Sequence, residues 1–161
     1  MKEYRFPPMI HPKYYNSRDF EMTYLEIPKS GCSSIKAHVN PSPTDENVPK
    51  YQVFTVVRDP IDRFISGYME LKRQKKTDLG FSEFILHVES DGFFDRHIVP
   101  QDVFIQTHFQ INHSLVVFTF DEYMKRVDFH YNPTKSDKPI LSKAQIERIS
   151  ALYAADFKYF A

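Results

Sequence analysis

Residues 52–68 read QVFTVVRDPIDRFISGY, and this stretch decides the fold. Its first part, residues 52–57, is apolar almost throughout, as strands buried on both faces of a parallel sheet are. Asp59 and Pro60 follow, and an Asp before a Pro suits the cap and the first position of a helix. Apolar residues then recur at the spacing of one helix face, which predicts an amphipathic helix from Pro60 to about Lys76.

Further strands and helices are predicted on both sides of that stretch. β-prone runs occupy residues 23–27 and 115–120. Helical patterns occupy residues 35–39, 82–88 and 121–127. A last helix is predicted after Ser142, because Gln145 follows three positions later, at the spacing of a capping box. Strands that alternate with helices favour an α/β fold with a parallel sheet. We expect residues 1–20 to form an irregular N-terminal arm and residues 40–50 and 91–101 to form loops.

Length and composition exclude several classes of protein. The chain has 161 residues, which predicts a single domain over residues 1–161. It carries 21 Lys and Arg against 21 Asp and Glu, and a chain without net charge is unlike general nucleic-acid binders. Its one cysteine, Cys32, rules out an internal disulfide framework and a multi-thiolate zinc site. Without a long apolar run or a signal-peptide pattern, we expect a soluble, cytoplasmic protein with no membrane span.

The first of two chemically informative junctions is the run IPKSGCSS at residues 27–34. Small residues that leave a strand and enter a helix expose several backbone N–H groups, and these favour an anion. Lys29 adds a cation, and Ser33 and Ser34 add hydroxyl donors. The run is not a Walker A motif, because it has one glycine and its lysine comes early. A well-capped turn without a ligand is the alternative.

The second junction places Arg58 at the carboxyl end of the predicted strand, where open α/β sheets bind their ligands. Its forked guanidinium fits a phosphate, and Ser66 lies about two turns into the following helix. The alternative is a surface ion pair between Arg58 and Asp59 or Asp62. The two junctions together suggest a ligand with two separated anionic groups.

Four segments, in this order, resemble the PAPS-dependent sulfotransferases (PAPS is 3′-phosphoadenosine 5′-phosphosulfate), specifically the carbohydrate sulfotransferase branch, family 2-like. IPKSGCSSIK at 27–36 resembles the family's 5′-phosphosulfate loop, and VVRDPIDRFISGY at 56–68 resembles its 3′-phosphate motif. HIVPQ at 97–101 is similar to an H-x-x-P-Q segment. LSKAQIERISALYAADFKYF at 141–160 is similar to the closing helix. The chain is short for this family, and insertions that shape sugar sites in larger members are absent.

The resemblance implies a P-loop NTPase-like three-layer core and a reaction that moves a sulfuryl group from PAPS to an acceptor hydroxyl, most readily of a carbohydrate. The product would be PAP, and no metal is required. Lys29 would be catalytic as well as cofactor-binding. The cofactor-binding residues it implies are Lys29, Ser30, Gly31, Cys32, Ser33, Ser34, Arg58, Ser66, Lys135 and Ser136. Arg63 is expected to be a surface residue, with a ligand-binding role as the alternative.

The acceptor needs a general base, and histidine is the side chain best suited to that role near neutral pH. His97 is the candidate, because it stands in the family-like HIVPQ segment, flanked by Asp95 and Arg96. His38 and the acids Glu70 and Asp95 stay open as alternatives.

Two other functions compete with sulfuryl transfer. One is a non-catalytic PAPS- or PAP-binding protein that keeps the nucleotide pocket. The other is a P-loop-type small-molecule kinase, which would need a Walker A loop and an acid for Mg²⁺. The Tyr- and Phe-rich arm is a candidate contact of a homo-oligomer.

Overall fold

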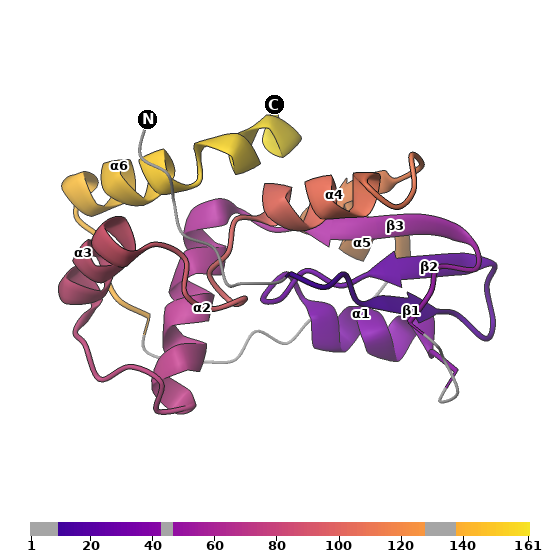
Figure 1. Ribbon diagram of the computed structural model, residues 1–161, viewed down its shortest axis with the longest axis horizontal. Coiled ribbons are helices and arrows are strands. Elements are labelled where there is room, and N and C mark those ends of the chain that lie inside the picture. The colour runs from indigo at the N-terminus through magenta and orange to yellow at the C-terminus, as the bar shows by residue number, and fades with distance from the viewer. Residues whose placement is uncertain (1–9, 43–46, 128–137) are drawn as a thin grey trace. The chain divides into compact units, whose positions relative to one another are not determined.

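The computed structural model describes residues 10–42, 47–127 and 138–161 (Figure 1). In chain order its elements are β1 (Tyr14–Asn16), β2 (Met22–Leu25), α1 (Cys32–Val39), β3 (Gln52–Val57), α2 (Pro60–Arg73), α3 (Phe81–Asp91), α4 (Gln101–Phe109), β4 (Val116–Thr119), α5 (Phe120–Val127), α6 (Lys143–Leu152) and the 3-10 helix η1 (Ala154–Phe160).

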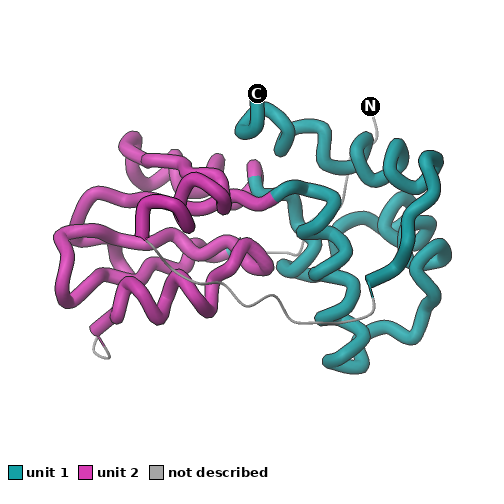
Figure 2. The backbone as a smooth tube through the Cα atoms, turned by 180° about the vertical axis from the view of Figure 1, so that it is seen from behind, with its two compact units in different colours: residues 1–10, 59–101, 134–161 teal, residues 11–58, 102–133 magenta. Residues whose placement is uncertain are grey.

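The chain divides into two compact units, which Figure 2 distinguishes by colour. The sheet unit consists of residues 11–58 and 102–133, and the helical unit consists of residues 1–10, 59–101 and 134–161. The first holds all four strands with α1 and α5, and the second holds α2, α3, α6 and η1. Each unit is described by itself.

The sheet has the strand order β1-β2-β3-β4. β2, β3 and β4 are parallel to their neighbours, and β1 pairs antiparallel with β2. The predicted α/β fold with a parallel sheet is therefore confirmed. The expected irregular arm is wrong for residues 14–16, which form β1. Their backbone pairs with β2, and such pairing depends on a strand that lies elsewhere in the chain.

Helices cover both faces of the sheet, so the sheet unit has three layers (Figure 1). On one face, α1 and α5 enclose an apolar core with Tyr24, Phe54 and Tyr123 at its centre. On the other face lies α4, where the Tyr14 hydroxyl is 2.7 Å from Nδ1 of the buried His108. The strand β2, the turn after it and α1 follow one another in the order of a P-loop.

The helical unit is built on α2, whose start obeys the predicted local signals. The Asp59 carboxylate accepts hydrogen bonds of 3.0 Å from the N–H groups of Ile61 and Asp62, and Pro60 is the first helical residue. α6 begins with the predicted capping box, in which Ser142 and Gln145 bond each other's backbone N–H groups. Both helix starts follow from neighbouring residues alone, which is why the sequence predicts them.

The sequence did not predict helix α4. Its buried residues Gln101, Phe104, Ile105 and His108 lie on one helix face, but two of them are polar, so the apolar periodicity in the sequence is weak. The helix is instead fixed by burial against the sheet. α2 also ends at Arg73, earlier than the expected Lys76.

Candidate functional site

The turn between β2 and α1 is tightly folded by two residues in the left-handed region. Lys29 has a φ of 66° and Gly31 has a φ of 79°. The buried Ser30 donates its N–H to the Ile27 carbonyl at 3.3 Å. The first N–H groups of a helix have no partner within the helix, and Gly31 at the cap of α1 has no side chain to accept from them. These N–H groups are the donors that the predicted anion site would use, and anion binding by the turn stays a prediction.

Gly31 is required by space as well as by its dihedral angle. A β-carbon built on Gly31 would lie 2.5 Å from the ring of Phe120, the first residue of α5. Real β-carbon contacts are not this short, so a larger residue would push the ring or the turn out of place. The turn and the start of α5 are thus closely packed.

Arg58 comes directly after β3, at the same sheet edge as this turn. Its Nη1 atom donates a long hydrogen bond of 3.4 Å to the carbonyl oxygen of Lys29. The two meet because β2 and β3 are parallel, so their carboxyl ends lie side by side. The structure therefore brings Arg58 and the Lys29 turn together within the sheet unit.

Glu26, just before the turn, is an acid that the sequence reasoning missed. The residue is 6% exposed, and its carboxylate forms an ion pair of 3.1 Å with Lys36 of α1. Burial alone would lower the pKa of Lys36, but the hydrogen bond and negative charge of Glu26 outweigh it and raise this pKa. Lys36 is thus paired with Glu26, and the cations that lie at the turn itself are Lys29 and Arg58.

In the helical unit, His97 forms a cluster with Asp95 and Lys76. Nδ1 of His97 is 2.6 Å from Oδ1 of Asp95, and the other carboxylate oxygen lies 3.0 Å from Nζ of Lys76. The hydrogen bonds from His97 and Lys76 outweigh burial, so the pKa of Asp95 is well below its usual range. Asp95 is therefore a carboxylate at neutral pH, and the predicted base has an anionic partner on its own loop.

The backbone of residues 97–101 is fixed by side chains from two other segments. Arg63 of α2 donates from Nη1 to the Val99 carbonyl at 2.6 Å. The hydroxyl of Tyr153, at the end of α6, donates to the Ile98 carbonyl. The Asp156 carboxylate accepts from the Gln101 N–H at 3.0 Å. This segment is held by specific contacts and is no free loop.

The expectation that Arg63 lies on the surface is wrong, because its side chain has no exposed area. A guanidinium is retained inside the unit because a main-chain carbonyl accepts from it. Tyr153 and Asp156 were also missed as anchors, although the quoted resemblance at residues 141–160 contains both. That pattern was the available signal.

The remaining predicted residues are distributed as follows. Ser30 is buried, Cys32 and Ser34 are half-buried and Ser33 is exposed, all in or beside the turn. Ser66 lies half-buried on α2 in the helical unit, as His97 does on its loop. Lys135 and Ser136 lie outside the described residues.

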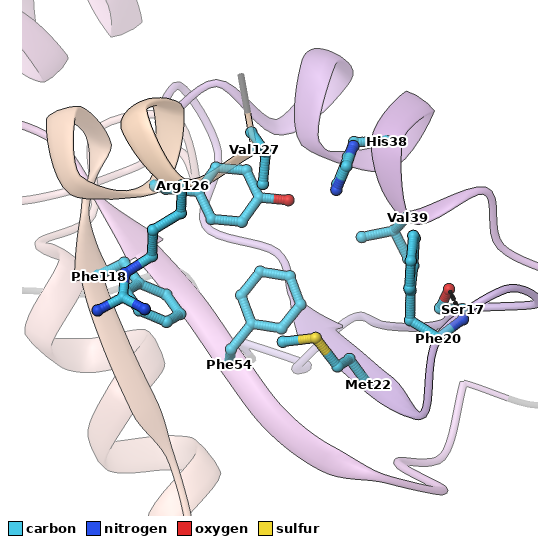
Figure 3. A pocket seen from close by; sticks show the side chains of 10 residues that line it. Ser17, Phe20, Met22, His38, Val39, Phe54, Phe118, Arg126 and Val127 are labelled. Carbon is cyan, nitrogen blue, oxygen red and sulfur yellow. Dashed lines mark hydrogen bonds between the residues drawn. The ribbon is translucent and has the colours of Figure 1, made fainter. Parts of the chain in front are cut away.

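A cavity of about 270 Å³ opens in the sheet unit, beside His38 and Val39 at the end of α1 (Figure 3). Aromatic and aliphatic side chains line most of it, and its polar members include His38 and Arg126. His38 stands between the rings of Phe20 and Tyr123, with centroids 5.8 and 6.1 Å away. It belongs to the last turn of α1, the end opposite Gly31. This placement disfavours His38 as a base that acts at the turn.

The part of the chain that the structure describes has neither a metal-binding cluster nor a membrane-spanning helix. Among residues 10–42, 47–127 and 138–161, no three His, Cys, Asp or Glu side chains are gathered in a way that could hold a metal ion. In the same ranges, none of the helices combines the length and the apolar content that crossing a bilayer requires.

The sequence and the fold of this chain can be compared with those of known proteins. A search of curated proteins found no match. Among solved structures, a sulfotransferase from Alicyclobacillus acidocaldarius matches with a TM-score of 0.47 and 18% identity, over 69% of this chain and 53% of that one. The chain thus spans about half the length of that structure. The sequence model of the Sulfotransferase family matches residues 37–132, which is more than half of the chain and includes Arg58, Arg63 and His97. On the strength of this match, the chain belongs to the sulfotransferase family.

Proposed function

We propose that this protein transfers a sulfuryl group from PAPS to an acceptor hydroxyl, and that the acceptor is a carbohydrate. The observation that carries the proposal is the meeting of the Lys29 turn with Arg58 at one sheet edge. Backbone donors, an ammonium group and a guanidinium are the groups that proteins use to hold phosphate and sulfate oxygens. Membership of the sulfotransferase family supports the same reaction. The PAPS donor and the carbohydrate acceptor come from the family resemblance.

In this mechanism the chain mainly positions the reactants and neutralises charge. The N–H groups at the start of α1, with the hydroxyls of Ser33 and Ser34, hold the 5′-phosphosulfate. Lys29 stabilises the charge that grows on the phosphate as it leaves. The acceptor oxygen bonds to sulfur while the bond from sulfur to the bridging phosphate oxygen breaks, and PAP leaves with that electron pair. His97 accepts the proton that the acceptor hydroxyl loses.

The 3′-phosphate contacts form a second part of the proposal. Arg58 and Ser66 are assigned to this phosphate, and Lys135 and Ser136 to the closing of the nucleotide site. These assignments rest on the family resemblance and on the position of Arg58 after β3. They predict that the 3′-phosphate adds to affinity, which distinguishes PAP from ADP.

Thermal unfolding with PAP, ADP and ATP tests the nucleotide site directly. A ligand that binds only the folded protein stabilises it by about 2.7 kcal/mol at a hundred times its Kd. We expect PAP to raise the Tm well above the effect of equal ADP, because only PAP carries the 3′-phosphate. Equal shifts with PAP and ADP would contradict the proposal. A larger shift with ATP and Mg²⁺ would favour the kinase.

Turnover of labelled PAPS separates an enzyme from a binder. We expect Lys29→Ala and Arg58→Ala each to lower the transfer rate by at least about 100-fold, the typical loss when a charge-stabilising donor is removed. The exposed Lys125 of α5 provides a matched control, and Lys125→Ala should keep the wild-type rate. Full activity of both site variants would overturn the site. PAP binding with no product from any acceptor tested would favour the non-catalytic binder.

A further inference from the structure

We infer that Asp95 is the positioning residue for His97, and that its carboxylate holds the Nδ1 proton so that Nε2 faces the acceptor as the proton-accepting atom. The inference rests on the proposed function, because it concerns the base of that reaction. It goes beyond the assignment of His97 as the base in two ways. It names Nε2 as the atom that accepts the proton, and it names Asp95 as the residue that sets the tautomer.

The tautomer follows from the chemistry of the partner. An ionised carboxylate has no hydrogen to donate, so the 2.6 Å contact between Asp95 Oδ1 and His97 Nδ1 requires the proton on Nδ1. In a neutral imidazole with a proton on Nδ1, Nε2 has the free electron pair. Nε2 can therefore take a proton from a hydroxyl group, and the imidazolium that results stays paired with Asp95.

The ring is held in orientation as well as in tautomer. Oδ1 of Asp95 also accepts the backbone N–H of His97 at 2.9 Å, and the Ile98 N–H donates to the Asp95 carbonyl at 3.0 Å. On the other side, a β-carbon built on Gly67 of α2 would lie 2.6 Å from the His97 carbonyl oxygen. The backbone of His97 is thus enclosed, and the side chain, 21% exposed, still reaches solvent. A base fixed in this way loses little freedom when it acts.

The charges around the pair support a permanent carboxylate. Lys76 bonds the second oxygen of Asp95 at 3.0 Å, and the pKa of Asp95 is well below its usual range. Arg96 follows Asp95 in the sequence, and the nearest part of α2 carries the charged residues Arg63 and Glu70, both of which have other partners. Arg63 is directed to the Val99 carbonyl, and Glu70 pairs with Arg73. Asp95 is thus the carboxylate in direct contact with the imidazole.

Nuclear magnetic resonance of the protein labelled with ¹⁵N-histidine tests the tautomer without any substrate. The chain has seven histidines, and His97→Gln identifies the signals of His97. We expect the neutral ring to carry its proton on Nδ1 in the wild type. Asp95→Asn should raise the fraction of rings that carry the proton on Nε2, because an asparagine amide can donate to Nδ1, which a carboxylate cannot do. A proton on Nε2 in the wild type, or an unchanged tautomer in Asp95→Asn, would overturn the inference.

Kinetics test the functional consequence. Asp95→Asn should lower kcat by about 100- to 10,000-fold with little change in KM, because the ring then presents the wrong tautomer to the acceptor. Asp91 and His87 provide a matched control, since they form an Asp–Nδ1 pair of 2.7 Å on the surface of α3. Asp91→Asn should leave kcat and the tautomer of His97 unchanged. If Asp95→Asn does not fold, Asp95→Glu, which keeps the charge, should retain the wild-type tautomer at a reduced kcat.

The two proposals can fail separately. If His97→Gln keeps the wild-type kcat, His97 is not the base, and the inference falls with that assignment. If His97→Gln abolishes transfer but Asp95→Asn keeps the wild-type kcat and tautomer, the proposed base stands and the role of Asp95 is refuted. If the protein transfers no sulfuryl group although the ring has the expected tautomer in the wild type and in Asp95→Asn, the proposed reaction fails while the Asp95–His97 relationship is confirmed.

Discussion

Nη1 of Arg63 lies 2.6 Å from the carbonyl oxygen of Val99, and the Arg63 side chain has no exposed area. This contact joins two sequence segments that separately resemble sulfotransferase motifs, residues 56–68 and residues 97–101. The Tyr153 hydroxyl joins a third segment to them through the Ile98 carbonyl. Burial raises the pKa of Tyr153 well above its usual range, so its hydroxyl stays protonated and remains a donor. Within the helical unit, three motifs therefore form one hydrogen-bonded structure that carries His97.

Replacement of Arg63 should destabilise the protein. Arg63→Met keeps much of the aliphatic part of the side chain but removes the guanidinium. The buried Val99 carbonyl then loses the hydrogen bond that Arg63 donates. We expect a loss of about 1–3 kcal/mol in the free energy of unfolding, measured by urea denaturation. Arg73→Met is the control, because Arg73 pairs with Glu70 at the exposed end of the same helix, and it should unfold like the wild type. An Arg63→Met protein of wild-type stability would contradict the assigned role.

Gly67→Ala should destabilise α2, although alanine normally favours a helix by about 1 kcal/mol over glycine. The new methyl group would lie 2.6 Å from the His97 carbonyl oxygen and 2.9 Å from a methyl of Ile98. Overpacking of this kind costs about 1–3 kcal/mol, which outweighs the helical gain. At Gly80 nothing lies within 4 Å of a built β-carbon, so Gly80→Ala should cost less than Gly67→Ala in the same urea titration. A more stable Gly67→Ala protein would show that the close approach to His97 is absent.

The contribution of Asp95 to stability should depend on pH. Its folded-state pKa is lowered, so it stabilises the folded protein above the ordinary carboxyl pKa of about 3.9 and loses that effect as the pH falls further. We expect Asp95→Asn to lower the free energy of unfolding at pH 7 by about 1–3 kcal/mol, because hydrogen bonds to a charged group are lost. The difference between variant and wild type should shrink between pH 4 and pH 2. A difference that is constant over this range would contradict the linkage.

Two substitutions of Lys29 should have the same effect on activity but different effects on stability. Its φ of 66° lies in the left-handed region, which costs a non-glycine residue about 1–2 kcal/mol relative to its usual conformation. Lys29→Gly and Lys29→Ala remove the same ammonium group, so we expect both to lose transfer activity. Lys29→Gly should have the higher Tm of the two, since glycine adopts this conformation without strain. If Lys29→Ala is as stable as Lys29→Gly, the turn does not keep this backbone conformation.

Local sequence determined the parts of this protein that depend on residues close together in the chain. The apolar run of β3, the Asp59 cap of α2 and the capping box at Ser142 all occur as predicted, because the atoms involved are a few residues apart. The alternation of such elements was sufficient for the α/β fold. The resemblance of residues 56–68 to a sulfotransferase motif likewise agrees with the family match.

Only the tertiary structure decided what depends on partners distant in the chain. Arg63 is buried because its acceptor, Val99, lies 36 residues away, and no local pattern shows that acceptor. The same holds for α4, which is fixed by packing on the sheet. It also holds for the contact of Arg58 with the turn at Lys29, because these two residues are 29 positions apart in the chain. Burial and hydrogen bonding act between surfaces, and which surfaces meet is settled only when the strands have paired and the helices have packed.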